Sequence, residues 1–168
     1  MLLHQIIHRF THGQIQHLAV ECRVISRVHA WADEAELERR YVAINAFEAE
    51  LVAAGTAVVK VMLNISPAEQ LERLTSRLHD PTKYWKYSPT DLDERAFWPQ
   101  YMDAYQRVFE KTSTEKAPWY VVPADKKWYA RAAVQEILIS TLEGLSLQWP
   151  AGDFDLEQER ARLKDAVL

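Results

Sequence analysis

Four cationic side chains follow an apolar stretch near the middle of this 168-residue chain. Arg73 and Arg77 are four positions apart, so they share one face of a helix, and Lys83 and Lys86 come shortly after them. Guanidinium and ammonium groups held at fixed positions suit a chain of phosphates, because they donate charge-assisted hydrogen bonds. Charge counts alone favour a plainer interpretation, a surface pair of Glu69 with Arg73 and solvated lysines. The order of the flanking residues favours the phosphate site.

A predicted strand and two predicted helix starts position these cations. Ala57–Ile65 is rich in β-branched and apolar residues, which indicates a strand buried on both faces. Ser66 and Glu69 form a capping box for a helix that ends at Asp80-Pro81, and Ser88 begins the next helix with the same chemistry. The first helix is expected to bury Leu71, Leu74 and Leu78. The cations would thus gather beyond the carboxyl end of a strand, where ligands of α/β folds bind.

The rest of the chain predicts helices alternating with strands. A helix over residues 33–54 is capped by Asp33 and closed by Gly55. Further predictions are a helix over 92–112, a short buried strand over 118–123, a helix from Asp125 to about 147, and a charged tail helix over 153–168. This alternation favours a parallel sheet with both faces covered.

The first thirty residues are harder to interpret. They indicate a short amphipathic helix over 2–10 and a short strand over 14–20, with residues 22–28 ambiguous between the two. His4, His8 and His12 fall four apart, a spacing that can share a metal. No nearby Cys, Asp or Glu completes such a site, so a polar helix face is the better interpretation and no metal ligand is assigned.

Composition restricts the partners. The net charge of −4 gives no general attraction for nucleic acid, so any anion site must be local. Cys22 is the single cysteine, which rules out an internal disulfide and fits a reducing compartment. No apolar run approaches membrane-spanning length, and the N-terminal residues lack the features of a signal peptide. We therefore expect a cytoplasmic protein with no nucleic-acid partner and no membrane partner.

The linked segments resemble the family-2 polyphosphate kinases, which are P-loop phosphotransferases with a thymidylate-kinase-like fold. The resemblance covers roughly residues 27–150. The matching segments are Ile44–Glu48 with Gly55-Thr56 (IN-x-FE, GT), Lys60–Gln70 (K-x-x-L-x-I-S, EQ), Arg73–Lys86 (R-x-x-x-R-x-x-DP-x-K-x-WK), Thr112–Trp119 (T-S-T, APW) and Pro123–Arg131 (P-A-D-x-KWYAR). So many linked segments make a chance match improbable.

The resemblance implies a fold, a site and partners. The fold would be a truncated P-loop kinase-like α/β domain over residues 1–152, incomplete at its N-terminus, with three layers, a parallel sheet and a helical lid over residues 66–95. Residues 153–168 would form the tail. The phosphate-binding residues of the lid would be Arg73, Arg77, Lys83 and Lys86, and Lys127 and Arg131 are candidates for lining the cleft or, equally, for a solvated helix face. The partners would be polyphosphate and a nucleotide (AMP, ADP or ATP), with magnesium as the cofactor.

Two elements of that family are missing from the sequence. The four glycines, Gly13, Gly55, Gly144 and Gly152, provide no glycine-rich phosphate loop with a following lysine. No aspartate precedes Asp33, so the magnesium carboxylate has no candidate and no catalytic residue is assigned. The chain is therefore expected to be a truncated or degenerate phosphotransferase, inactive alone. The alternative is a non-enzymatic polyanion-binding or protein-interaction module.

The missing strand has a further consequence. Its loss would leave the strand over residues 57–65 with an unpaired edge, and apolar strand edges pair with other chains. The sequence therefore predicts self-association, as a homo-oligomer or a less regular assembly.

Overall fold

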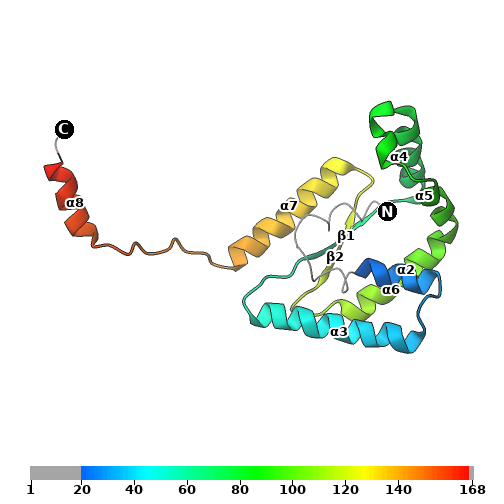
Figure 1. Ribbon diagram of the computed structural model, residues 1–168, viewed down its shortest axis with the longest axis horizontal. Coiled ribbons are helices and arrows are strands. Elements are labelled where there is room, and N and C mark those ends of the chain that lie inside the picture. The colour runs from blue at the N-terminus through cyan, green and yellow to red at the C-terminus, as the bar shows by residue number, and fades with distance from the viewer. Residues whose placement is uncertain (1–19, 167–168) are drawn as a thin grey trace.

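The computed structural model describes residues 20–166 of the chain. At its centre lie two parallel strands, β1 (Lys60–Asn64) and β2 (Trp119–Pro123), paired so that Lys60 lies opposite Trp119 (Figure 1). The predicted parallel pairing is confirmed, although β1 is shorter than the stretch over residues 57–65 that predicted it.

Helices make up most of the remaining structure. In chain order they are α2 (Val20–Val28), α3 (Glu34–Ala53), α4 (Pro67–His79), the 3-10 helix η2 (Pro81–Lys86), α5 (Pro89–Asp93), the 3-10 helix η3 (Glu94–Phe97), α6 (Trp98–Thr112), α7 (Lys127–Gly144) and α8 (Leu156–Asp165). The segment over residues 22–28, ambiguous in the sequence, is thus helical.

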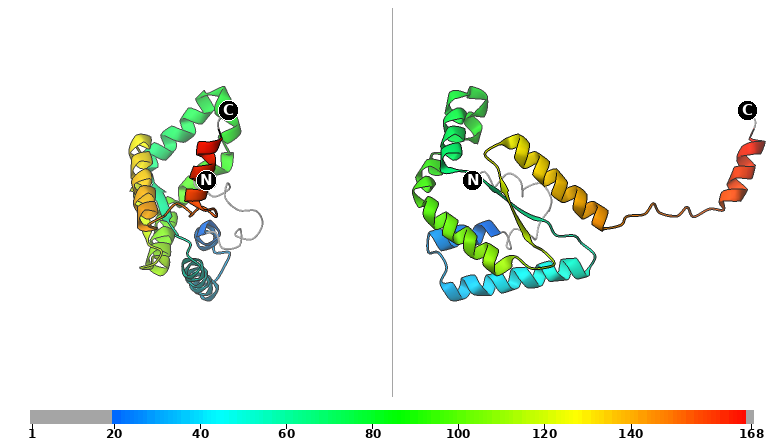
Figure 2. Two further views of the ribbon diagram at one scale, coloured as in Figure 1. Left: turned by 90° about the vertical axis from the view of Figure 1, so that its left-hand side faces the viewer. Right: turned by 180° about the vertical axis from the view of Figure 1, so that it is seen from behind.

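Helices cover both faces of the strand pair (Figure 2). Consecutive strand residues point to opposite faces. Leu63 of β1 and Val122 of β2 pack on one face against α7, whereas Trp119 packs on the other face against α2, α3 and α6. The buried side chains on the face that Trp119 contacts are Val24, Leu37, Tyr41, Ile44, Ala104 and Val108. The expected three-layer α/β fold is therefore confirmed.

The N-cap side chains bond as predicted at two helices and differ at the third. The second half of the predicted Ser66–Glu69 capping box does not form, because the Ser66 amide donates to Asp125 and the Glu69 carboxylate accepts from Arg73. Asp33 Oδ1 accepts a hydrogen bond from the Glu36 amide at 2.8 Å, and Ser66 Oγ accepts one from the Glu69 amide at 3.1 Å. Gly55 adopts a φ of 87° just after α3, where a left-handed residue is needed. Ser88 makes no cap, because its hydroxyl pairs with that of Thr90 at 2.7 Å.

Two further predictions were wrong in detail. Only Leu74 of the three α4 leucines is buried, because no element within residues 20–166 covers Leu71 and Leu78, which are 46% and 51% exposed. The single helix predicted over residues 92–112 is divided into the end of α5, η3 and α6, with Pro99 in the first turn of α6, where its missing N–H costs nothing.

The predicted tail forms α8, which begins after Asp155 caps its first turn with two hydrogen bonds of 2.9 Å. It lies apart from the other helices at the end of an extended stretch (Figure 1). None of the helices in residues 20–166 is both long and apolar enough to cross a membrane. The helix predicted over 2–10, the strand over 14–20 and the three histidines lie outside the described residues, except that Val20 is the first residue of α2.

Candidate functional site

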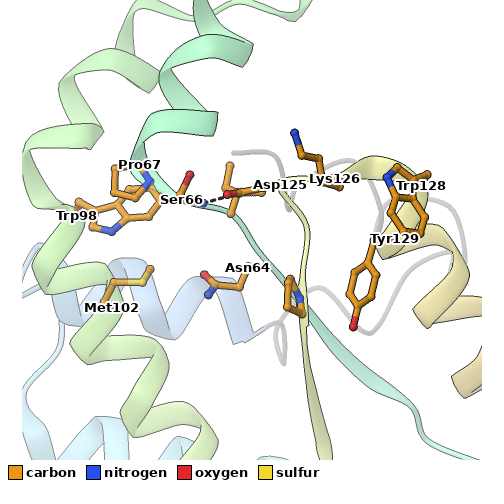
Figure 3. Close-up of a pocket in the computed structure, with 11 residues that line it drawn as sticks. Asn64, Ser66, Pro67, Trp98, Met102, Asp125, Lys126, Trp128 and Tyr129 are labelled. Atoms are coloured by element: carbon orange, nitrogen blue, oxygen red, sulfur yellow. Dashed lines mark hydrogen bonds between the residues drawn. The ribbon is translucent and has the colours of Figure 1, made fainter.

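A hollow of about 530 Å³ lies beyond the carboxyl ends of β1 and β2. It is lined by Asn64, Ile65, Ser66, Pro67, Trp98, Met102, Pro123, Asp125, Lys126, Trp128 and Tyr129. Figure 3 shows Trp98 and Met102 on the α6 side and Trp128 and Tyr129 on the α7 side, with the strand ends between them. Since ligands of parallel sheets bind beyond the carboxyl ends of the strands, this hollow is the candidate site.

Asp125 joins the two strand ends at the floor of the hollow. Its Oδ1 accepts a hydrogen bond from the Ser66 amide at 2.7 Å (Figure 3), and this bond lowers the pKa of Asp125. The sequence predicted that Asp125 would begin the last main helix. That prediction was wrong, because its carboxylate is directed to the start of α4 and α7 begins two residues later.

Arg73 fixes α4 to the end of β2. Its Nε donates to Glu69 Oε1 at 2.6 Å and its terminal nitrogen donates to the Ala124 carbonyl at 2.6 Å, and the side chain is 15% exposed. The guanidinium therefore lies near the strand ends as expected, but two of its hydrogen-bonding directions are already used within the protein.

Arg77 of α4 bonds to the part of the lid segment (residues 66–95) that follows this helix. One of its terminal nitrogens donates to the Lys86 carbonyl at 3.1 Å and to Asp91 Oδ2 at 3.3 Å. The side chains of Arg77 and Asp91 are only 15% and 9% exposed. The second carboxylate oxygen of Asp91 is buried and has no hydrogen-bond partner in the described part of the chain, so this group can accept another donor.

Lys83 and Lys86 are held more loosely. Lys83 Nζ lies 2.7 Å from Asp80 Oδ2, and this pair, with two hydrogen bonds from Thr82, lowers the pKa of Asp80 to about 2. Lys86 Nζ lies 4.7 Å from the centre of the Trp85 ring, an indole that is itself largely exposed. Exposed contacts of this kind contribute at most about 1 kcal/mol each, so both lysines can turn towards a ligand.

The two candidates on α7 fall in different places. Lys127 is the first residue of the helix, and its neighbours Lys126 and Trp128 line the hollow. Arg131 lies one turn on and lines a separate hollow beside β1. The sequence had not singled out Asn64 or Lys126, although their positions directly after the strands were the available signal.

A buried ion pair holds β1 against the helices behind the site. Lys60 Nζ lies 2.6 Å from Glu48 Oε2 and 2.5 Å from the Thr112 carbonyl oxygen. It also lies 5.5 Å from the centre of the Trp119 ring. Asn45 likewise donates from its side chain to the Lys111 carbonyl at 2.8 Å. These contacts tie α3 to β1 and to the end of α6.

A magnesium ion, which the resemblance implies, would need a set of carboxylates. Within residues 20–166 no group of three or more His, Cys, Asp or Glu side chains is arranged to hold a metal ion. The described residues therefore do not fit the ion by themselves, and we derive no step through it.

A parallel strand pair between helical layers, with a hollow beyond its carboxyl ends, defines an α/β domain. The family model for polyphosphate kinase 2 matches residues 19–149. The chain therefore belongs to the polyphosphate kinase 2 family.

Several known proteins are similar to it. The chain is 45% identical over 129 residues to an uncharacterized protein of Leptolyngbya boryana, covering 77% of this chain and 93% of that one. It is 43% identical over 127 residues to the AMP/ADP-polyphosphate phosphotransferase of Meiothermus ruber, covering 76% of this chain but 48% of the relative. The crystal structure of polyphosphate kinase 2 from Arthrobacter aurescens TC1 matches with 62% identity and a TM-score of 0.83, over 88% of this chain and 52% of that one.

The relatives therefore differ in length. This chain spans nearly the whole of the Leptolyngbya protein but about half of the phosphotransferases that it resembles.

Proposed function

We propose that this chain contributes the lid and the strand-end pocket of a polyphosphate:nucleotide phosphotransferase. Family membership supports the reaction class, which is phosphate transfer between polyphosphate and AMP or ADP, or between polyphosphate and ADP or ATP. The observation that carries the proposal is the hollow beyond both strand ends, because it lies between the start of α4 and the start of α7.

The lid cations would bind the phosphates. Arg73 and Arg77 are held in place by their internal hydrogen bonds, and a fixed guanidinium loses little conformational freedom when it binds an anion. Lys83 and Lys86 are partly exposed and would follow the phosphate chain. The start of α7 favours an anion as well. Its N-cap residue, Lys126, has no acceptor atom in its side chain, so the N–H groups of the first turn have no side-chain cap.

We further propose that the 168 residues do not transfer phosphate by themselves. Phosphoryl transfer depends on positioning and charge neutralisation by a glycine-rich loop, its lysine and a metal ion, and the sequence has no such loop. A coupled assay of ATP formation from ADP, polyphosphate and magnesium tests this with the pure chain. The expected result is no activity above background, and magnesium-dependent ATP synthesis would refute it.

Binding of polyphosphate by the lid can be tested separately. Arg77→Ala should weaken binding about tenfold, a loss of about 1.4 kcal/mol, which is typical of a charge-assisted hydrogen bond. The matched control is Arg39→Ala, which removes a cation paired with Glu36 on α3, away from the lid. Isothermal titration at two salt concentrations provides the measurement. Equal losses in both variants would reject a localised site.

The alternative is a non-enzymatic polyanion-binding or interaction module, which the missing phosphate loop also supports. The two functions differ in their nucleotide requirement. A phosphotransferase half should bind ADP as well as polyphosphate, whereas a polyanion module should bind polyphosphate and show no saturable binding of ADP.

A further inference from the structure

A histidine outside the candidate site joins the turn between α2 and α3 to the end of the lid segment. His29 Nε2 lies 3.1 Å from Glu94 Oε2, and the histidine side chain is 21% exposed. Since an ionised carboxylate can only accept, the hydrogen of this bond is on Nε2. Tyr101 of α6 donates to the same carboxylate oxygen at 2.7 Å. Glu94 thus accepts two hydrogen bonds, one from the turn and one from α6.

The turn is shaped to place the histidine ring among aromatic side chains. Ala30 adopts a φ of 52°, a left-handed conformation that is uncommon for residues other than glycine. The rings of His29 and Trp31 on either side of it are stacked with their centres 5.2 Å apart, and Phe97 of η3 meets the histidine ring edge-on at 5.1 Å. A protonated imidazole binds both the indole face and the carboxylate more strongly than a neutral imidazole does.

The other titratable groups around this contact keep their charge near neutral pH. On the helices that flank the turn, Arg27 and Glu34 pair with each other at 2.7 Å. Burial and the hydrogen bond to Glu94 raise the pKa of Tyr101, so its hydroxyl remains a donor. Within residues 20–166, His29 is the single cationic side chain that pairs with Glu94. Histidine is the side chain that ordinarily changes charge near neutral pH, so the strength of this contact depends on the imidazole.

Glu94 lies where the two ends of the lid segment meet. Its neighbour Arg95 donates to the Pro67 carbonyl at 2.9 Å and to Gln70 Oε1 at 2.7 Å, both at the start of α4. The first and last parts of residues 66–95 are therefore held together. Figure 1 shows the α2–α3 turn on the same side of the molecule as the start of α6. The bonds of Glu94 to the turn and to α6 thus decide how often this end of the lid opens.

We propose that His29 holds the end of the lid against the α2–α3 turn in a pH-dependent way. Protonation of the ring converts the hydrogen bond to Glu94 from one with a neutral donor into one with a charged donor. The lid end therefore opens less often at pH 6 than at pH 8, by about threefold, because charged donors make the stronger bonds. The proposal depends on the described residues alone and does not depend on whether the lid binds phosphate.

Hydrogen exchange of the 168-residue chain at pH 6 and pH 8 tests this, with the intrinsic exchange rate at each pH divided out. The amides of Tyr87 and Asp91 donate backbone hydrogen bonds of 3.0 Å inside the lid, so their protection reports its opening. Their protection should be about threefold higher at pH 6. In His29→Gln, which keeps a neutral N–H donor and cannot become charged, protection at the two pH values should agree. Glu94→Gln should behave in the same way.

The matched control is His79→Gln, which removes the second histidine of the described residues. His79 lies at the end of α4, where its Nδ1 is 2.9 Å from the Thr75 carbonyl oxygen and not near Glu94. This variant should keep the threefold difference. The four histidines before residue 20 are present in every variant, so they cannot account for a difference between them.

Circular dichroism at both pH values establishes that each variant is folded. If His29→Gln does not fold, Glu94→Gln carries the same expectation at a side chain that is 41% exposed. Equal protection of the wild-type lid at pH 6 and pH 8 overturns the proposal. So does a difference that persists in the His29 variant, that disappears in the His79 variant, or that is equally large in α7, which packs against β2. The exchange is measured without ligand, so it is independent of the polyphosphate assays.

Discussion

Removing the charge of Glu48 should destabilise the protein more than any comparable change at its surface. The side chains of Glu48 and Lys60 are 11% and 8% exposed, and they meet at 2.6 Å. Glu48→Gln keeps the shape but leaves the Lys60 ammonium buried without an opposite charge, because the groups around it, including the Thr112 carbonyl, are then neutral. Breaking a buried ion pair from one side costs about 3–5 kcal/mol, a large share of a typical total of about 5–15 kcal/mol.

The matched control is the pair of Glu38 and Lys111, which joins α3 to α6 at the surface. Its atoms are 2.9 Å apart and each side chain is 40% exposed. Glu38→Gln should therefore cost less than about 1 kcal/mol. Adding Lys60→Met to Glu48→Gln removes the stranded charge, so the double variant should regain at least half of the loss.

Urea unfolding followed by tryptophan fluorescence measures these differences. With a urea dependence of about 2 kcal/mol per molar, a loss of 3 kcal/mol lowers the unfolding midpoint by about 1.5 M. If Glu48→Gln and Glu38→Gln lower the free energy of unfolding equally, the buried pair does not hold β1 to α3 in the way argued above. A double variant less stable than Glu48→Gln would contradict the account of the stranded charge.

Three further predictions follow from the lid and the tail. Asp91→Asn should raise the affinity for polyphosphate about three- to tenfold in titrations, because the carboxylate competes for Arg77; unchanged or weaker binding would contradict this. The pKa of Asp80 is about 2 in the folded protein, below its ordinary value of 3.8, so its pairing with Lys83 stabilises the fold above about pH 4 and is lost as the pH falls towards 2. Asp80→Asn should flatten that part of the profile of thermal unfolding midpoint against pH, and an unaltered profile would refute the assignment. Deleting residues 153–168 should leave the free energy of unfolding within about 0.5 kcal/mol of the intact chain in urea, since α8 lies apart from the core; a larger loss would show that it packs there.

Local signals in the sequence predicted much of the fold. The caps at Asp33 and Ser66 are short-range hydrogen bonds between residues three apart, so the sequence order alone contains them. The alternation of apolar strands with helices can also be read directly from the sequence order, and it predicted the parallel pairing. The exposure of Leu71 could not be predicted, because the pattern shows an apolar side of α4 but does not show whether another element covers it.

The sequence predicted an anion site beyond the strand ends but not the contacts of its residues, and none of the four predicted lid cations lines the hollow that lies there. Cations at helical spacing after a strand placed Arg73 and Arg77 near the strand ends. Their partners could not be deduced, since the Ala124 carbonyl is 51 residues from Arg73 in the chain and Asp91 is 14 residues from Arg77. Which carbonyl or carboxylate is reached depends on how α4 crosses the strand ends, and that is a property of the packed fold.

The pairing of lid cations with carboxylates affects how fast a polyanion can arrive. Residues 66–95 contain five lysine or arginine side chains against six aspartate or glutamate side chains, and the whole chain has a net charge of −4. At distances beyond the Debye length, a polyphosphate therefore meets a weakly repulsive surface and is not steered towards the lid. Added salt should accelerate encounter, or leave its rate unchanged, while it shortens the lifetime of the bound state, because only the close contacts are attractive. Recognition by this lid is thus a short-range event, in which the ligand must exchange places with carboxylates that already occupy the cations.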